Sequence, residues 1–221
     1  TLMFVGGISY KIIGAILGAA LPLGGILIWY IQQPGQILLH DYQLNRVLSF
    51  LNPSDYLLTT YNQQYNSIMA IGSGMLTGKG LDNNTITSVK GGNFISEPQT
   101  DFIFAVAGEE YGFVGCVVIV VLLLAISIEC IRMSLRAKDL SGKILCCGMG
   151  GLIALQSFIN ICVATGLAPN TGTPLPFVSY GLTSLVSLYI GMGIVLNVGL
   201  QSSVYNKELM KKEMDRKEDY L

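Results

Sequence analysis

The sequence predicts an all-α, polytopic membrane protein with about four full membrane spans and one large loop between the first two. Its composition supports this, because 51% of the 221 residues are hydrophobic and only 12% are charged, whereas soluble globular domains carry about 25% charged residues. Four apolar stretches lie near 12–31, 113–132, 143–163 and 180–200. Each is close to the roughly 20 residues that cross a bilayer as a helix.

The connections between these spans complete a single expected membrane domain, 1–221. A large loop, 32–101, separates the first two spans, and 201–221 forms a charged tail. Loops of this length are usually functional or disordered, and this one is patterned. Apolar residues near helical spacing over 37–51 predict an amphipathic helix on the membrane surface, and 61–70 predicts a second short helix.

Lys and Arg residues are distributed unevenly about the predicted spans. Of the 13 such residues, ten lie before the first span, between the second and third, or after the last. The other three, Arg46, Lys79 and Lys90, lie in the long loop. Because cytoplasmic connections are enriched in Lys and Arg, we expect a cytoplasmic C-terminus and a long loop on the outer face. The five cysteines lack CxxC or Cys/His spacing, so we expect no metal site from them.

Asp101 lies at the junction of the long loop and the second span, within SEPQTDFIFAVAGEEYG over 96–112. An ionisable group beside a membrane segment is costly and usually has a function, and a carboxylate there can act as a general base. Alternatively, Thr100 and Asp101 cap the following helix. Glu109 and Glu110 follow on the apolar run, where structural support is favoured over a direct catalytic role.

The run IGSGMLTGKG over 71–80 has four glycines in ten residues. Gly78 and Gly80 permit positive φ and a close backbone approach to a ligand. Lys79 between them, together with Arg46, could hold an anionic group of a ligand, because such groups need positive charge or backbone N–H groups. The alternative is that each cation faces solvent or lipid headgroups.

A second loop, 166–181, is rich in Pro and Gly and cannot be regular helix. Irregular backbone at membrane depth is tolerated where it is buried in protein or lines a cavity. We therefore expect this loop to enter the site, with Pro174 and Pro176 shaping it and Ser179 and Tyr180 offering hydroxyl groups. The alternative is a rigid outer cap.

Two polar residues one turn apart, Gln156 and Asn160, interrupt the third predicted span. We interpret them as a polar clamp between helices rather than as substrate contacts. The small residues Gly112, Gly115 and Cys116 form a face of the second span that suits close approach by another helix.

Three segments resemble signatures of one family, and they occur in the family's order. They are YNQQYNSIMAIGSGMLTGKGL over 61–81, TDFIFAVAGEEYGFVG over 100–115, and GLAPNTGTPLPFVSYGLTSLVSLYIGMGIVLNV over 166–198. The family is the SEDS cell-wall polymerases, the RodA/FtsW/SpoVE group. The resemblance implies a ten-helix protein that polymerises lipid II on the outer face of the bacterial cytoplasmic membrane. It also implies a class B penicillin-binding protein as partner and no nucleic acid.

The resemblance covers only the last four helices and the large outer loop of that fold. We therefore expect this chain to be its C-terminal portion and to be inactive alone. Asp101 matches the family's essential aspartate and is the expected catalytic base. Glu97, Glu109 and Glu110 match supporting acids, and Lys79 matches the glycine loop's lysine. Arg46 also matches a basic position of the surface helix.

The resemblance leaves three functions to compare. The first is a peptidoglycan glycosyltransferase acting in elongation, division or sporulation. The second is a lipid II flippase, and the third is a scaffold that holds the penicillin-binding protein without catalysis. The acids and cations cluster at the outer face, which favours the enzyme, because a flippase needs a polar path across the membrane. A divalent cation, Mg or Mn, bridging Asp101 and a pyrophosphate would suit oxygen ligands.

Overall fold

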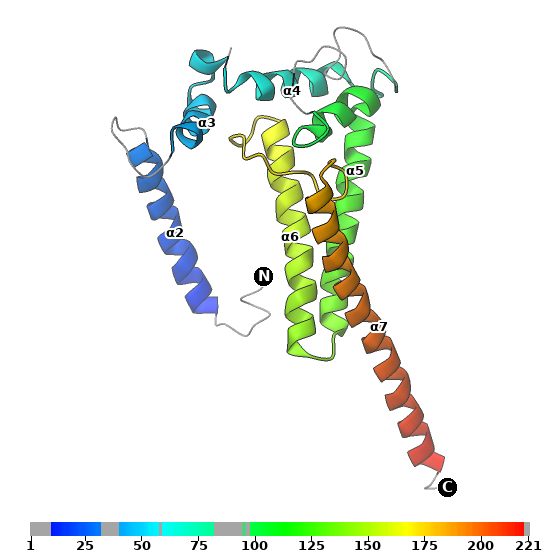
Figure 1. Cartoon of the computed structure of the whole chain (residues 1–221). Helices are drawn as coiled ribbons and strands as arrows, with labels where there is room; N and C mark the ends of the chain where they lie inside the picture. The colour runs from blue at the N-terminus through cyan, green and yellow to red at the C-terminus, as the bar shows by residue number, and fades with distance from the viewer. Residues whose placement is uncertain (1–9, 32–39, 58, 82–94, 96–97, 219–221) are drawn as a thin grey trace.

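The computed structural model describes residues 10–31, 40–57, 59–81, 95 and 98–218, and over these ranges its regular structure is entirely helical, as predicted (Figure 1). A single-turn helix, η1, covers Pro53–Tyr56. The α-helices are α2 (Tyr10–Ile31), α3 (Asp41–Leu51), α4 (Asn62–Ser73), α5 (Ile103–Arg136), α6 (Leu140–Ala164) and α7 (Leu182–Glu218).

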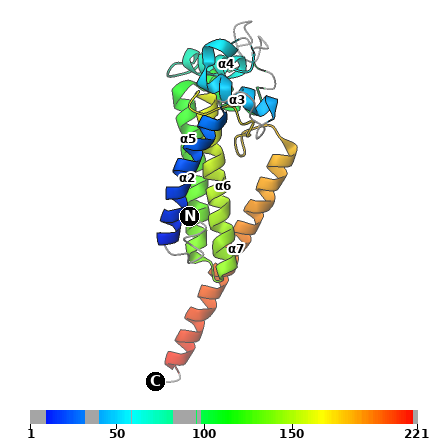
Figure 2. The same ribbon diagram turned by 90° about the vertical axis from the view of Figure 1, so that its left-hand side faces the viewer.

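Three of the described helices are long and apolar enough to cross a membrane. They are α5, α6 and the 182–201 part of α7, and they pack together with α6 antiparallel to both α5 and α7 (Figures 1 and 2). The first predicted span is helix α2, whose apolar segment, Gly14–Ile26, is shorter. Helix α2 stands apart from the other three in Figure 1, and its Trp29 side chain is exposed.

The loops gather at one end of the bundle. Helices α3 and α4 confirm the two short helices predicted in the long loop, although 37–39 lie outside the described residues. Both lie at the end of the bundle where α5 starts and where α6 gives way to the Pro-rich loop, whereas the α5–α6 turn lies at the opposite end (Figure 1). This arrangement agrees with the alternation that the Lys and Arg distribution predicts.

A buried cluster fixes the start of α5 against its neighbours. Phe102 is 2% exposed and packs with Ala70 of α4, Val163 of α6, and Ala105 and Ile95. Burying a Phe side chain contributes about 1.5–3 kcal/mol. The residue that follows Asp101 is therefore anchored in the core.

Helix α5 is broken at Gly112, where φ is 67° and ψ is −163°. An unbroken helix would pair the N–H groups of Phe113 and Val114 with the carbonyls of Glu109 and Glu110. The break leaves these four backbone groups without their helical partners. Such groups must find others near a membrane, because each unpaired one costs several kcal/mol.

The glycine-rich segment after α4 pairs all four groups. Phe113 N–H donates to Met75 O over 2.8 Å, and Val114 N–H donates to Leu76 O over 3.2 Å. In return, Glu109 O accepts from Lys79 N–H over 2.9 Å, and Glu110 O accepts from Gly80 N–H over 3.1 Å. The segment 75–80 is therefore spliced into the break of α5.

This splice uses the small-residue face that we expected to receive a partner helix. A Cβ at Gly112 would lie 2.3 Å from Gly78 N, and a Cβ at Gly115 would lie 2.2 Å from Tyr111 Cβ. Gly112 is covered by the glycine segment, and Gly115 by a side chain of its own helix. Contacts within the chain thus account for the small size of Gly112 and Gly115, and the docking of a partner helix on this face stays a prediction.

The splice predicts different costs for two neighbouring glycines. Both have positive φ, 79° at Gly78 and 90° at Gly80, so alanine costs about 1–2 kcal/mol of backbone strain at either position. Only at Gly78 would the new Cβ also meet backbone, 2.1 Å from Glu110 O, whereas at Gly80 nothing lies within 4 Å. We expect Gly78→Ala to lower the thermal unfolding midpoint in detergent clearly more than Gly80→Ala does. Equal shifts would contradict the splice.

Candidate active site

Asp101 lies in the turn before α5, and its side chain does not cap the helix. The N-cap residue is Phe102, and no side-chain hydrogen bond caps this end. The Asp101 backbone instead is held from α6, because Asn160 Nδ2 donates to Asp101 O over 2.8 Å. The capping alternative is thus not the arrangement found.

The Asp101 carboxylate lies beside Arg46 at one point of the Pro-rich loop. A Cβ built on Gly172 would be 3.4 Å from Asp101 Oδ2 and 3.5 Å from Arg46 Nη1. Arg46 Nη1 also donates to Asn170 O over 3.4 Å. Gly172 has a φ of 67°, a conformation that glycine adopts at little cost. Three segments far apart in sequence thus meet at this carboxylate.

Two opposing effects act on the pKa of Asp101. Burial raises the pKa, because it disfavours the charged form, and the nearby positive charge of Arg46 lowers it in part. The net result is a pKa above the ordinary value of 3.8. Such a carboxylate is a stronger base than an exposed aspartate, while the guanidinium keeps positive charge next to it.

The Pro-rich loop lies at the candidate site, as predicted. Its two hydroxyl-bearing candidates, Ser179 and Tyr180, differ in burial and in their hydrogen bonds. Ser179 is 3% exposed; its Oγ accepts from Leu175 N–H over 2.6 Å and donates to Thr100 O over 2.5 Å. Tyr180 is exposed on the surface, and its N–H donates to Gln99 O. Both residues tie this loop to the segment that carries Asp101.

The two loop prolines differ in their surroundings. Pro176 is fully buried, whereas Pro174 is only partly buried and its carbonyl accepts a hydrogen bond from Gln156 Nε2 over 2.9 Å. Gln156 and Asn160 were expected to clamp two helices together. They instead clamp α6 to loops, because their amides reach loop carbonyls at the end of the bundle.

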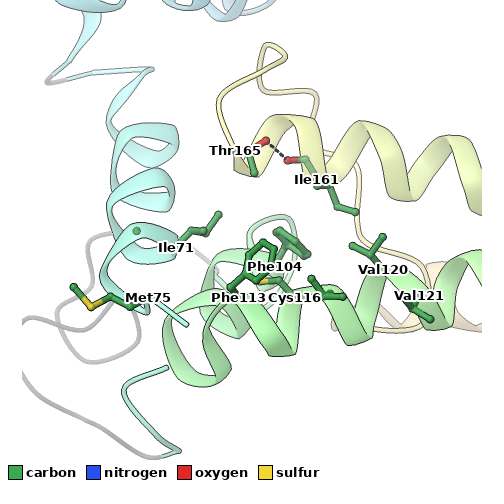
Figure 3. A pocket seen from close by; sticks show the side chains of 11 residues that line it. Ile71, Met75, Phe104, Phe113, Cys116, Val120, Val121, Ile161 and Thr165 are labelled. Carbon is green, nitrogen blue, oxygen red and sulfur yellow. Dashed lines mark hydrogen bonds between the residues drawn. The ribbon is translucent and has the colours of Figure 1, made fainter. Parts of the chain in front are cut away.

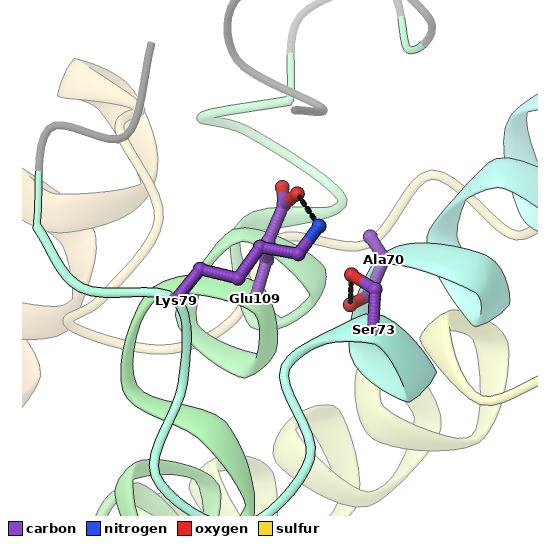
Figure 4. Close-up of polar contacts among 4 residues, drawn as sticks. All are labelled: Ala70, Ser73, Lys79 and Glu109. Atoms are coloured by element: carbon purple, nitrogen blue, oxygen red, sulfur yellow. Dashed lines mark hydrogen bonds and ion pairs between the residues drawn. The ribbon is translucent and has the colours of Figure 1, made fainter. Parts of the chain in front are cut away.

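Lys79 forms an ion pair within the splice. Lys79 Nζ lies 2.8 Å from Glu109 Oε1, and the Glu109 side chain is 6% exposed (Figure 4). Glu109 is six residues beyond the start of α5 at Ile103, which is about 9 Å along a helix axis. The structure therefore brings Arg46 to Asp101, and brings Lys79 to Glu109 at a different place. Gly78 and Gly80 approach the α5 backbone, and Glu110 contributes its carbonyl there. Glu97 lies outside the described residues.

An apolar pocket of about 510 Å³ opens between α4, α5 and α6 (Figure 3). Ile71 and Met75 line it from the α4 side, Phe104, Phe113, Cys116 and Val117 from α5, and Ile161 from α6. Its walls carry almost no polar surface. The pocket suits a hydrocarbon chain or an apolar side chain and offers no groups for proton transfer.

Within the described ranges, no group of three or more His, Cys, Asp or Glu side chains is arranged to hold a metal ion. A Mg or Mn ion at this site would be held by the Asp101 carboxylate. The remaining oxygen ligands would come from water and from phosphate groups, as is usual for Mg²⁺.

A family comparison decides the relationship. The profile described as "Cell cycle protein", for the FtsW, RodA and SpoVE proteins, matches residues 1–204. The chain belongs to the FtsW/RodA/SpoVE family. The SEDS resemblance drawn from the three motifs is therefore confirmed.

Individual members of the FtsW/RodA/SpoVE family match over most of this chain. Stage V sporulation protein E of Bacillus subtilis is 41% identical over 76% of the chain and 45% of its own length. The peptidoglycan glycosyltransferase MrdB of Escherichia coli is 32% identical over 94% and 53%. A probable peptidoglycan glycosyltransferase FtsW of Geobacter metallireducens is 34% identical over 82% and 52%. The chain spans about half the length of these curated relatives.

A solved structure supports the fold of this SEDS chain. The match, from work on "structural coordination of polymerization and crosslinking by a peptidoglycan synthase complex", has a TM-score of 0.67 and 26% identity. It covers 91% of this chain and 52% of the matched one.

Sequence reasoning missed several residues that build the site. Asn170 accepts from Arg46 through its carbonyl and from Gly172 N–H through Oδ1. Gln64, 2% exposed, donates to Val163 O and Ala168 O and so fixes the end of α6 to α4. An isolated amide in a polar loop gives no sequence signal for such contacts.

The raised pKa of Asp101 predicts a stability change on substitution. The folded state holds the Asp101 proton more tightly than the unfolded state does, so stability falls as the pH rises through the folded pKa. Asparagine does not ionise. We expect Asp101→Asn to raise the thermal unfolding midpoint at neutral pH. The gain should shrink as the pH falls through the raised folded pKa and should be absent below 3.8, the ordinary value.

A helix cap would give the opposite pattern. Removing a capping side chain with Asp101→Ala would cost about 1 kcal/mol, and asparagine would be neutral. A lowered midpoint for Asp101→Asn at neutral pH would contradict the burial that raises this pKa.

Proposed function

We propose that the protein containing this chain is a peptidoglycan glycosyltransferase that polymerises lipid II into glycan strands in elongation, division or sporulation. One observation carries the proposal. The half-buried carboxylate of Asp101 has a raised pKa and lies beside the guanidinium of Arg46. Helix α3, the turn before α5 and the Pro-rich loop meet there. The peptidoglycan glycosyltransferases among the relatives supply the reaction class.

The proposed step is a displacement at an anomeric carbon. A sugar hydroxyl attacks that carbon, the new glycosidic bond forms, and the bond to the pyrophosphate breaks. Asp101 accepts the hydroxyl proton as the bond forms. Undecaprenyl pyrophosphate leaves with the bonding electron pair, and positive charge near its oxygens favours its departure.

Arg46 is the cation that we place closest to this reaction. Its guanidinium lies beside Asp101, and a planar fork of donors suits phosphate oxygens. Lys79 remains a proposed contact of the lipid donor, although its ion pair with Glu109 already holds it at the splice. Gly78 and Gly80 are proposed to shape that neighbourhood. Tyr180 is exposed and is proposed to face the substrate from the Pro-rich loop. The expectation that Ser179 offers its hydroxyl to a ligand is corrected, because this buried hydroxyl is bonded to Leu175 N–H and Thr100 O. A Mg or Mn ion would share Asp101 with the pyrophosphate.

We propose that the site lies on the outer face of the bacterial cytoplasmic membrane and that the C-terminus is cytoplasmic. The α5–α6 connection, at the end of the bundle away from Asp101, carries Arg132, Arg136, Lys138 and Lys143 within or beside it. Such enrichment is typical of cytoplasmic connections.

We propose a class B penicillin-binding protein as partner, with its membrane helix against α5 or α6. The matched solved structure is described as a peptidoglycan synthase complex. Exposed apolar side chains cover the outer surface of α5, and Val117 lines the pocket on this surface. An apolar pocket between two membrane helices offers a seat for a side chain of a third.

The first test measures polymerisation of purified lipid II by the full-length protein. Asp101→Asn keeps the size of the side chain but accepts a proton poorly. We expect polymerisation to fall by about 10²–10⁴-fold, the range typical of general acid–base catalysis. Lipid II binding and membrane insertion should be retained, since the substitution spares the backbone contacts of Asp101.

Asp139→Asn is the matched control, because this aspartate lies in the α5–α6 connection away from the site. It should leave polymerisation unchanged. Undiminished polymerisation by Asp101→Asn would contradict the proposed base. Lipid II transport by the protein without any polymerisation would favour the flippase.

The second test compares neighbouring exposed valines on α5. Val117 lines the apolar pocket, and Val118, which is also exposed, does not. We expect Val117→Trp to fill the pocket and reduce co-purification of the penicillin-binding protein several-fold. Val118→Trp adds the same bulk outside the pocket and should leave the complex intact. Equal recovery of both complexes would place the partner elsewhere.

A further inference from the structure

Asn160 stands out among the buried side chains because of its polarity and its position. It is 1% exposed, in the second-last turn of α6, and among the largest fully buried side chains of the described ranges. A buried amide in a membrane helix is costly unless its hydrogen-bonding groups are used. The contacts of Asn160 therefore indicate what offsets that cost.

Both donor hydrogens of Asn160 go to loops that form the candidate site. Nδ2 donates to Asp101 O over 2.8 Å and to Thr173 O over 2.6 Å. Thr173 follows Gly172, the residue beside which the Asp101 carboxylate and the Arg46 guanidinium lie. One side chain thus joins the backbone of Asp101 to the backbone of the loop that faces its carboxylate.

The other end of the same amide has no partner in the described part of the chain. Asn160 Oδ1 is buried and accepts no hydrogen bond there. An unpaired buried acceptor costs about 1–3 kcal/mol. An apolar residue of similar size would avoid that cost, so packing alone does not account for asparagine at this position.

The neighbouring amide on α6 provides a comparison. Gln156, one turn earlier, donates to Pro174 O over 2.9 Å and so holds the same Pro-rich loop. Within the described residues, the Gln156 amide forms no hydrogen bond with the segment 98–102. Asn160 is therefore distinguished by its second bond, to the residue that bears the proposed base.

We propose that Asn160 is a positioning residue for Asp101, and this inference rests on the proposed glycosyltransferase function. Asn160 fixes the Asp101 backbone relative to Thr173, and thereby sets where the carboxylate lies with respect to the acceptor hydroxyl and to Arg46. It contacts neither substrate nor reacting atoms. Small displacements of a reacting group can lower a rate by about 10²-fold.

The test is a double-mutant cycle in the full-length protein with lipid II. Asn160→Ala should lower kcat by up to about 10²-fold and leave KM for lipid II within a few-fold. In an Asp101→Asn background, Asn160→Ala should cause little further loss, because residues that act as a unit are non-additive. Ser157→Ala is the matched control. Ser157 is buried on the same helix, and within the described part of the chain its hydroxyl donates a hydrogen bond to Ile153 O. It should leave kcat unchanged.

Hydrogen–deuterium exchange gives a readout that does not depend on activity. Asn160→Ala should speed exchange in peptides covering 98–102 and 170–175, whereas Gln156→Ala should affect 170–175 alone. If Asn160→Ala fails to fold, Asn160→Asp keeps the volume and removes the donor NH₂ group. It should show the same loss of kcat.

Three outcomes are distinguishable. A kcat within two- to three-fold of wild type for Asn160→Ala or Asn160→Asp would overturn the positioning role, as would an equal loss in both backgrounds of the cycle. Full polymerisation by Asp101→Asn would instead overturn the proposed base, and the exchange experiment would still report whether Asn160 holds the Asp101 segment.

Discussion

Backbone pairing around the break in α5 is the constraint on which the end of the bundle depends. A helix near a membrane can stop hydrogen bonding to itself only where other groups take over. At Gly112 the takeover is complete, because two donors and two acceptors of α5 pair with the 75–80 segment. The ion pair of Lys79 with Glu109 adds a side-chain contact at the same place. The short part of α5 before Gly112 can therefore run at an angle that the longer part after it does not dictate.

Asp101 gains its environment from this arrangement and from two amides of α6. The part of α5 before Gly112 starts directly after the turn that holds Asp101, and Phe102 anchors this start of the helix in the core. The Pro-rich loop reaches the same turn through Ser179 and Tyr180. Hydrogen bonds to backbone carbonyls, rather than contacts between charged groups, hold these segments together, so the carboxylate of Asp101 is left beside the Arg46 guanidinium.

Much of the fold could be predicted from the sequence because hydropathy and helical periodicity are local signals. The spans at 113–132 and 143–163 lie within α5 and α6, and the span at 180–200 begins two residues before α7. The short helices in the long loop appeared where apolar spacing placed them. Asp101 could be singled out because a charged group beside an apolar run is costly. The contact between Arg46 and the Asp101 region joins segments 55 residues apart in sequence, and no local pattern encodes it.

The glycines illustrate the limit of such prediction. A run of glycines reports that backbone comes close to something, and sequence alone does not say to what. We expected a ligand at Gly78, and the structure places the carbonyl of Glu110 there. Asn160 was likewise recognised as a buried polar group, but its partners lie on loops rather than on another helix. In both cases the residue type gave the kind of contact, and the tertiary fold chose the partner.

The order of elements in the spliced region also bears on how the chain assembles. Proteins are synthesised from the N-terminus, and segments made first can fold first. The 75–80 segment precedes α5, so the groups that complete the break at Gly112 already exist when α5 is made. In the reverse order, the interrupted helix would be made first, and its four polar backbone groups would lack partners until the 75–80 segment followed. With the glycine run upstream of α5, the partners of these four groups are present in the chain as soon as the helix is made.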